Sequence, residues 1–456
     1  MYNLYDIINT ERDTVMAKLK IGVFGGYRGH TMINVLLHHD DAELVAVCDK
    51  YEPLLDTVRQ DAEKNGLNIA LYTDFEEFIK HDMDAVVLAN YANEHATYAI
   101  RCMNAGLHVM TEVLPCETMA QAVELIETVE KTGKIYTYAE NYCYMRHAFE
   151  MQLRYEKGEI GEVQYIEGEY IHDCTAIWPQ ITYGDPNHWR NRMYATFYCT
   201  HSIGPMLTIT GRRPVQVVGF EAPIPQEYKR TGIARGAGIE MITLDNGAIA
   251  RSVHGDLKRE PASYTYMVYG QKGMMEASRF PDKERNIEGN GISATYKEPL
   301  MHVYREGEEY CKGEWEDYSP EPPIAKEQAL KFGTHGGSDF YATHFFIEKI
   351  LGKPDGKYAI DVYKAVDMGI CGILAYRSIL NGNVPIKIPN LRNPEERDAW
   401  RNDNACTTPE VAGDQLLPRS SKPHDEIPPE TYEFHKKLWK NDGQTIKYGT
   451  EFELKK

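Results

Sequence analysis

Short apolar segments alternate with stretches of helical periodicity along the first third of the chain, and this alternation restricts the fold more than any other feature. From Lys20 onward, the runs KIGVFGG, ELVAVCDK, DAVVLAN and KIYTYAEN are typical of strands, and TMINVLLHH and MAQAVELIETVEKTG are typical of helices. Continuously apolar strands that alternate with helices form a parallel sheet covered on both faces. The sequence therefore predicts a doubly wound α/β domain over residues 18–145.

The region after His147 follows a different pattern. Segments such as VQYIEGEYIHD and YTYMVYGQKGMMEAS alternate apolar and polar residues, and Asp245-Asn246-Gly247 is typical of a hairpin turn. Helical periodicity returns in SDFYATHFFIEKILG and VYKAVDMGICGILAYRSILNG. We expect an α+β domain with a large, mostly antiparallel sheet over residues 146–390. A polar, proline-rich C-terminal arm over residues 391–456 is expected to wrap the body or a partner subunit.

The composition restricts the partners and the compartment. Lysine and arginine number 50 against 68 aspartates and glutamates, a net charge of −18, which opposes general binding to nucleic acid or anionic membranes. Nine scattered cysteines without a C-x-x-C pair are typical of a reducing compartment. The N-terminal segment is charged throughout, and no stretch approaches the roughly 18 apolar residues of a membrane helix. We therefore expect a cytoplasmic protein.

The glycine-rich segment IGVFGGYRGH at residues 21–30 ends a predicted strand and opens a predicted helix. Glycines in such a turn let the backbone approach a pyrophosphate, and the helix N-terminus supplies N–H donors. Asp49 closes the next predicted strand, where a carboxylate accepts the ribose hydroxyls and repels a 2′-phosphate. The pattern predicts a Rossmann domain that binds NAD rather than NADP; a plain tight turn with a capping aspartate is the alternative. The predicted contacts are Gly25, Gly26, Tyr27, Arg28 and Asp49.

Two further segments follow predicted parallel strands at their carboxyl ends, where open α/β sheets bind ligands. Asn90, Asn93 and His95 follow DAVVLA, and Glu112 and Val113 follow HVM. We predict that these five residues contact the cofactor. For the two asparagines, helix capping is the alternative interpretation.

Tyrosines and histidines in the second domain occur in pairs that share a face. Tyr170 and His172 alternate on a predicted strand, and Tyr198 and His201 are three residues apart at the start of a predicted helix. A tyrosine can act as a base only when a cation or a strong hydrogen bond lowers its pKa from about 10. Each of these residues, taken alone, is also compatible with a purely structural role.

Two other groups are candidates for ligand contact. His188-Trp189-Arg190 combines an aromatic face with guanidinium donors, which suits a sugar ring and its hydroxyls; a loop anchored by a buried tryptophan is the alternative. His335 and Asp339 share a face if they are helical, and they are open to substrate contact or to metal binding with His172 or His201.

The order of GGYRGH, CDK and NYANEHATYAIRCMNAGLHVMTE, followed by a sheet domain, resembles the Gfo/Idh/MocA oxidoreductases over about residues 18–390. Most of that family reads E-K-P where this chain reads Glu112-Val113-Leu114-Pro115, so the lysine that acts near the reacting hydroxyl is absent. Glu140-Asn141, GEYIHD at 168–173, YCTHSIGP at 198–205 and HGGSDF at 335–340 are similar, in the same order, to the NAD-dependent glycosidases of glycoside hydrolase family 109, the α-N-acetylgalactosaminidase type.

The resemblance implies an NAD-dependent glycoside hydrolase. Transient oxidation at C3 of the sugar acidifies the C2 proton, a base removes that proton, the group at C1 is eliminated, water adds, and the hydride returns. By the resemblance, Tyr170 is the base at C2, His201 serves the C3 hydroxyl or the leaving group, and Glu140 orients the substrate or the nicotinamide, with Tyr198 and His172 assisting. It also implies cofactor contacts from Asn141, Trp189 and Arg190, substrate contacts from Glu140, His188, Arg190, His335 and Asp339, and no metal.

Two other hypotheses compete with the glycosidase. One is a sugar or cyclitol dehydrogenase with net oxidation, against which Val113 counts; the other is a non-catalytic NAD-dependent sensor, which has no need for tyrosines and histidines on one face. We expect a small glycoside or sugar as the ligand, with no nucleic-acid or membrane partner. The resemblance implies a homodimer or homotetramer.

Overall fold

The N-terminal part of the chain forms a six-stranded parallel sheet. The computed structural model describes residues 17–259, 262–279, 283–288, 291–296, 300–309 and 312–441. The strand order β3-β2-β1-β4-β5-β6 is that of a Rossmann domain. The strands are β1 (Leu19–Phe24), β2 (Ala42–Cys48), β3 (Ala70–Tyr72), β4 (Ala85–Leu88), β5 (His108–Thr111) and β6 (Tyr136–Tyr138), and the helices between them are α1 (Gly26–Leu36), α2 (Glu52–Lys64), α3 (Phe75–Phe78), α4 (His95–Asn104) and α5 (Met119–Thr132).

The second sheet has nine strands in the order β16-β15-β12-β11-β7-β10-β9-β8-β17. Strands β7 and β10 run parallel and the other neighbours are antiparallel, so the predicted α/β fold class with a mostly antiparallel second sheet is confirmed. The strands are β7 (Val163–Ile171), β8 (Pro214–Glu221), β9 (Gly238–Leu244), β10 (Ile249–Gly255), β11 (Ser263–Gly270), β12 (Gly273–Ala277), β15 (Met301–Glu306), β16 (Gly313–Tyr318) and β17 (Ile386–Lys387); β13 (Lys283–Glu288) and β14 (Gly291–Tyr296) form a separate hairpin.

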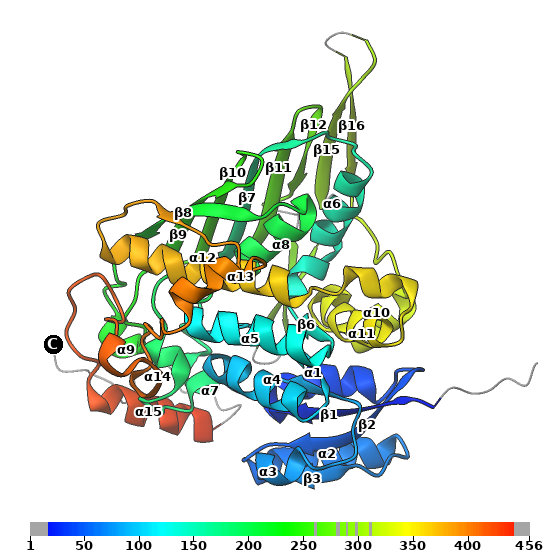
Figure 1. Ribbon diagram of the computed structural model, residues 1–456, viewed down its shortest axis with the longest axis vertical. Helices are drawn as coiled ribbons and strands as arrows, with labels where there is room; N and C mark the ends of the chain where they lie inside the picture. The colour runs from blue at the N-terminus through cyan, green and yellow to red at the C-terminus, as the bar shows by residue number, and fades with distance from the viewer. Residues whose placement is uncertain are drawn as a thin grey trace, which may run out of the picture.

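A layer of helices separates the two sheets (Figure 1). It contains α6 (Arg146–Glu156), α8 (Thr200–Thr210) and α12 (Val362–Leu380). Every residue of α8 is buried, and α12 contacts both β8 and the Rossmann elements α5 and β6. A Cβ at Gly168 would lie 2.4 Å from the carbonyl oxygen of Ser202, so glycine at this position lets α8 lie directly on β7. This close packing brings the first turn of α8 against the strand that carries Tyr170.

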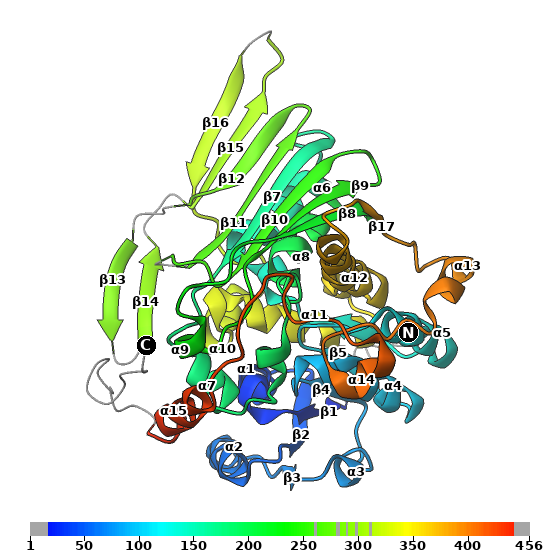
Figure 2. The same cartoon turned by 90° about the vertical axis from the view of Figure 1, so that its left-hand side faces the viewer.

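The described part of the C-terminal arm, up to Asn441, lies along the body of the chain (Figure 2). Its helices are α13 (Pro394–Arg397), α14 (Pro409–Ala412) and α15 (Pro429–Lys440). Arg397 and Arg401 form ion pairs with Glu130 and Glu127 of α5, each at 2.6 Å. Farther on, α15 packs against α7 (Trp178–Thr182) and α9 (Tyr228–Thr231). The domain boundaries drawn from the sequence stay a prediction, and residues 442–456 and the N-terminal residues 1–16 lie outside the described ranges.

Among the described residues, no helix combines the length and apolar character needed to cross a membrane.

Buried histidines make the stability of the fold sensitive to acid. Burial lowers the pKa of His95, His147 and His435 to about 4 each, below the value of about 6.5 in an unfolded chain. Between pH 6.5 and 4 the unfolded chain binds more protons, so stability falls as the pH falls, by up to about 1.4 kcal/mol per pH unit for each such residue. We expect the thermal unfolding midpoint to drop steeply from pH 7 to pH 5.

A variant and a control test this prediction. The His147 ring stacks on Tyr266 with centroids 5.6 Å apart, so His147→Phe keeps an aromatic ring there and removes the proton acceptor. We expect this variant to show a shallower pH dependence than the wild type, whereas His424→Gln, at an exposed position, keeps the wild-type slope. Identical slopes for all three proteins would contradict the assignment.

Candidate functional site

The turn between β1 and α1 has the geometry of a pyrophosphate-binding loop. Gly25 has φ of 95°, and a Cβ there would lie 2.5 Å from the backbone of Ala89 at the end of β4. The N-cap residue of α1 is Gly25, which has no side chain to cap the helix, so N–H donors of the first turn other than that of Gly26 are available to an anion. The Asp49 carboxylate at the end of β2 accepts hydrogen bonds from the N–H groups of Gly26 at 2.8 Å and Tyr51 at 2.9 Å. The turn and this carboxylate fit the pyrophosphate and the ribose of a dinucleotide.

Unpaired acceptors next to the turn extend the fit. The side-chain oxygens of Asn90 and Asn93 are buried without a hydrogen-bond partner in the described part of the chain, so hydroxyl or amide donors of a ligand would satisfy them. His95 Nδ1 lies 3.0 Å from the carbonyl oxygen of Leu114, burial lowers its pKa to about 4, and its buried Nε2 has no hydrogen-bond partner in the described part of the chain. Its geometry is that of a neutral histidine that anchors the segment after β5.

Substitution of Gly25 tests the turn. We expect Gly25→Ala to weaken NAD binding by at least about tenfold, since the methyl group meets the Ala89 backbone and the left-handed φ costs an alanine about 1–2 kcal/mol. Isothermal titration with NAD measures the effect. Gly66→Ala is the matched control because Gly66 has φ of 72° with no atom of the described residues within 4 Å of the added Cβ, and it should bind NAD as the wild type does. Equal affinities of the Gly25 and Gly66 variants would contradict the proposed role of the turn.

Half-buried Arg28 connects two buried carboxylates. Its guanidinium lies 2.5 Å from Glu112 and 3.1 Å from Asp339, and Asp339 also accepts from Asn141 at 3.0 Å and lies 2.7 Å from His335 Nδ1. Burial raises the pKa of Glu112 while Arg28 lowers it, and the donors around Asp339 hold the pKa of that carboxyl well below its usual value despite its burial. The sequence placed these residues in cofactor or substrate contact; the structure brings them together in one network beside the turn.

Val113, which follows β5 together with Glu112, was also predicted to contact the cofactor. It is buried, and its backbone N–H donates to Glu112 at 3.0 Å. Val113 therefore fixes the Glu112 carboxylate that pairs with Arg28.

Six aromatic and imidazole side chains converge where α8 meets β7, and we call them the tyrosine–histidine cluster: Tyr142, Tyr170, His172, Tyr198, His201 and Tyr264. The His201 ring is central, with centroids 4.1 Å from Tyr142, 4.7 Å from Tyr170 and 5.0 Å from Tyr198. The Tyr170 hydroxyl lies 3.3 Å from His172 Nδ1, as their alternation on the strand predicts. The four tyrosines and histidines selected from the sequence thus lie together.

Glu140 lies under the cluster and holds His201. Its Oε1 is 2.5 Å from His201 Nδ1, its side chain is fully buried, and its Oε2 has no hydrogen-bond partner among the described residues. A carboxylate at Nδ1 fixes the imidazole with Nε2 as the free nitrogen and stabilises the imidazolium that forms when Nε2 takes a proton. The pair is suited to accept and return a hydroxyl proton.

Burial keeps the phenols of the cluster protonated. It raises the pKa of Tyr170 and of Tyr142 well above 10 and that of Tyr198 to about 12. Arg190 opposes the shift at both Tyr170 and Tyr198, and its guanidinium lies 5.6 Å from the centre of the Tyr198 ring. In this state Tyr170 is a proton donor, and it becomes a base only after its proton passes to His172 or a further cation approaches.

The segment around Trp189 borders the cluster. Arg190 lies over the Trp189 ring at 4.3 Å, and that ring is 6.3 Å from Tyr198. His188 accepts a hydrogen bond from the Arg190 backbone N–H at 3.2 Å, and burial lowers its pKa to about 3. Arg190 is therefore placed to reach a ligand in the cluster, whereas neutral His188 shapes the loop.

Sequence reasoning missed two members of the cluster. Tyr142 follows β6 directly after the Glu140-Asn141 motif, and its ring is 5.2 Å from Tyr264. Tyr264 lies on β11 opposite Tyr170, with ring centroids 5.6 Å apart. The alternation YTYMVYG was a strand signal only; the register that sets Tyr264 beside Tyr170 depends on pairing between distant segments.

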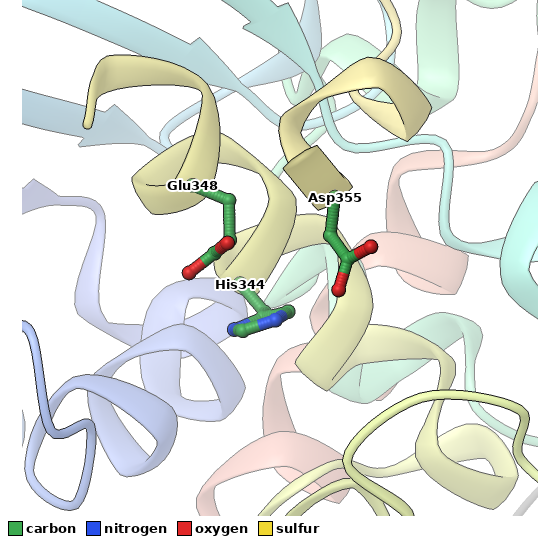
Figure 3. A group of neighbouring side chains, drawn as sticks. All are labelled: His344, Glu348 and Asp355. Carbon is green, nitrogen blue, oxygen red and sulfur yellow. The ribbon is translucent and has the colours of Figure 1, made fainter. Parts of the chain in front are cut away.

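A separate histidine–carboxylate group lies at the far end of α11 (Ser338–Ile350). His344 and Glu348 are on the helix and Asp355 is in the turn that follows it, with ligand atoms within 4.8 Å of one another (Figure 3). His344 Nδ1 is 3.0 Å from His39 Nε2, and the Lys353 ammonium is 3.3 Å from Glu348. A cation already neutralises the most buried carboxylate of the group, so we assign no metal to it.

Comparisons with known proteins agree with this geometry. Residues 19–140 match the family described as "Oxidoreductase family, NAD-binding Rossmann fold", and residues 234–398 match "Glycosyl hydrolase 109, C-terminal domain". A Glycosyl hydrolase family 109 protein 1 of Phocaeicola vulgatus is 26% identical over 431 residues, covering 85% of this chain and 86% of that protein. A protein of the same description from Bacteroides thetaiotaomicron is 26% identical over 417 residues, covering 82% and 84%.

Solved structures share the fold. Levoglucosan dehydrogenase in complex with NADH superimposes with a TM-score of 0.63 at 17% identity, covering 82% of this chain and all of that one. Scyllo-inositol dehydrogenase from Lactobacillus casei, solved with NAD(H) and scyllo-inositol, gives 0.61 at 16% identity with the same coverage.

The fold, the glycine turn and Asp49 define an NAD-binding protein of the oxidoreductase class. More particularly, the N-terminal domain is similar to the Gfo/Idh/MocA oxidoreductases, and residues 234–398 are similar to the C-terminal domain of the glycosyl hydrolase family 109 proteins. The resemblance and the cofactor predicted from the sequence are confirmed.

Proposed function

We propose that this protein is an NAD-dependent glycosidase that cleaves a glycosidic bond without net oxidation of the sugar. The observation that carries the proposal is the tyrosine–histidine cluster around the Glu140–His201 pair, at the carboxyl edge of the NAD-binding sheet. The relatives named glycosyl hydrolase family 109 proteins support the same reaction class. Bound NAD would supply reversible oxidation of one ring hydroxyl, which makes the neighbouring C–H acidic.

The side chains of the cluster divide the proton transfers among them. His201 Nε2 takes the proton of the C3 hydroxyl, and Glu140 stabilises the charge that appears on the imidazole. Tyr170 removes the C2 proton after its own proton has passed to His172 Nδ1, 3.3 Å away. Arg190 lowers the cost of that phenolate, since a nearby cation favours the charged form. Tyr198 and the unpaired oxygen of Glu140 are left to bind substrate hydroxyls.

The residues around the tyrosine–histidine cluster give the remaining contacts. Trp189 and Arg190 offer an aromatic face and a planar donor group to a pyranose. Among the predicted substrate contacts, His335 is partly exposed, whereas Asp339 has its oxygens occupied by the Arg28 network and therefore acts by positioning His335. The subunit arrangement remains a prediction from the family resemblance.

A glycoside panel in D₂O tests the proposal. The purified protein is incubated with catalytic NAD and with α- and β-linked neutral, acidic and N-acetylated aryl glycosides. We expect release of the aglycone, deuterium at C2 of the free sugar, and no accumulation of NADH. Stoichiometric NADH without glycoside cleavage would overturn the glycosidase in favour of a sugar or cyclitol dehydrogenase.

A further inference from the structure

Four aromatic side chains from distant parts of the sequence gather at the outer end of the NAD-binding turn: Tyr27, Tyr51, Tyr183 and Trp439, which we call the outer aromatic group. The Trp439 ring lies 5.3 Å from Tyr183 and 6.3 Å from Tyr51, and Tyr183 lies 6.4 Å from Tyr27. Tyr27 and Tyr51 are 56% and 52% exposed. Large aromatic faces that remain open to solvent beside a ligand site indicate a surface that a ligand covers.

The group flanks the carboxylate that identifies the adenosine end of the site. The Asp49 carboxylate accepts hydrogen bonds from the N–H groups of Gly26 and Tyr51. Gly26 directly precedes Tyr27, and Tyr51 directly precedes α2. The Trp439 ring therefore lies beside Tyr51, whose backbone N–H binds the Asp49 carboxylate. In Rossmann domains the adenosine lies against the end of the second strand, where this carboxylate is.

Helix α15 holds Trp439 in this position. A Cβ at Gly184 would lie 2.4 Å from the backbone nitrogen of Lys436, so the helix packs directly on the α7 turn. His435 is 4% exposed, and the Thr431 hydroxyl donates to the carbonyl oxygen of Lys229. The end of the C-terminal arm is thus anchored on the body, with Trp439 at its last turn (Figure 2).

We propose that the C-terminal arm is part of the cofactor site, with Trp439 and Tyr51 forming an aromatic wall for the adenosine half of NAD. An adenine ring offers a π-face, and stacking on aromatic side chains contributes to nucleotide binding whatever else holds the phosphates. The wall slows release of the cofactor, because a ligand leaving the turn must first separate from a ring carried by an anchored helix.

Slow release has a consequence for the reaction. An enzyme that ends each cycle with its NAD unchanged does not need to exchange it, whereas net oxidation requires NADH to leave at every turnover. The inference itself rests on NAD binding, not on glycoside cleavage, so a failed glycoside panel leaves it standing.

Binding of cofactor fragments to Trp439 variants tests the inference. ADP-ribose carries the adenosine half, and nicotinamide mononucleotide does not. We expect Trp439→Ala to bind ADP-ribose about tenfold more weakly in isothermal titration and to release NADH about tenfold faster when it is displaced by excess NAD. Affinity for nicotinamide mononucleotide stays within twofold of the wild type, and Trp439→Phe recovers most of the loss because it keeps an aromatic face.

Trp315→Ala is the matched control, because Trp315 is 68% exposed on β16 at the opposite end of the molecule (Figure 1) and should leave both affinities unchanged. If Trp439→Ala unfolds, Tyr51→Ala removes an exposed ring of the same wall and should weaken ADP-ribose binding alone. Wild-type ADP-ribose affinity and NADH release in a folded Trp439→Ala variant would overturn the inference, as would an equal loss for ADP-ribose and nicotinamide mononucleotide.

Discussion

Tyr170→Phe lowers the rate of glycoside hydrolysis by about 10²–10⁴-fold, the range typical for loss of a proton-transfer group, and abolishes deuterium incorporation at C2. The phenol is the group that pairs with His172 at 3.3 Å, and phenylalanine keeps the ring packing against His201 and Tyr264 while removing the transferable proton. NAD affinity stays at the wild-type value. Steady-state rates and mass spectrometry of the product in D₂O measure the two effects.

Tyr165→Phe is the matched control for this variant. Tyr165 lies on the same strand with its hydroxyl bonded to Glu167 at 2.5 Å, but it points to the opposite face from Tyr170 because side chains alternate along a strand. This control keeps the wild-type rate and deuterium exchange. If Tyr170→Phe retains full exchange at C2, Tyr170 is not the base.

Glu140→Gln lowers kcat by about 10²-fold, the low end of the range for loss of a proton-transfer contribution. The amide keeps an oxygen next to His201 Nδ1 and fills the same space, but it no longer stabilises the positive charge that appears on the imidazole during proton transfer. Steady-state kinetics with a fixed glycoside measure the change.

A second buried Glu–His pair separates this effect from a general loss of stability. Glu240 Oε1 lies 2.7 Å from His254 Nε2 on neighbouring strands, and both side chains are almost completely buried. Glu240→Gln lowers the unfolding midpoint and leaves kcat unchanged. If Glu140→Gln also lowers only the unfolding midpoint, the Glu140–His201 pair is structural.

Local sequence patterns were sufficient to predict the fold of the Rossmann domain. The apolar strands, the glycine turn and Asp49 are close in sequence, and their roles follow from the backbone conformation that each residue type permits. The shared face of Tyr170 and His172 could also be predicted, because side chains two residues apart on a strand point to the same side of the sheet.

Contacts between segments that are distant in the sequence could not be predicted from local patterns. Arg28 was expected at the cofactor as part of the turn, yet its guanidinium pairs with Glu112 and Asp339, and nothing local specifies a partner 311 positions away. Tyr264 and Trp439 reach their neighbours through sheet register and through the path of the arm. Such partners are set by the tertiary fold, and the family resemblance supplied only those that its motifs contain.

The Arg28 network has a consequence for how the molecule moves. Arg28 belongs to the Rossmann turn and Asp339 to α11, so separating these elements at this edge would take the half-buried guanidinium away from the fully buried Asp339 carboxylate. A charge that stays buried and loses its partner is costly. Hinge opening at this edge is therefore disfavoured. The two elements are therefore held together before any ligand arrives, and a ligand does not have to spend binding energy on drawing them together.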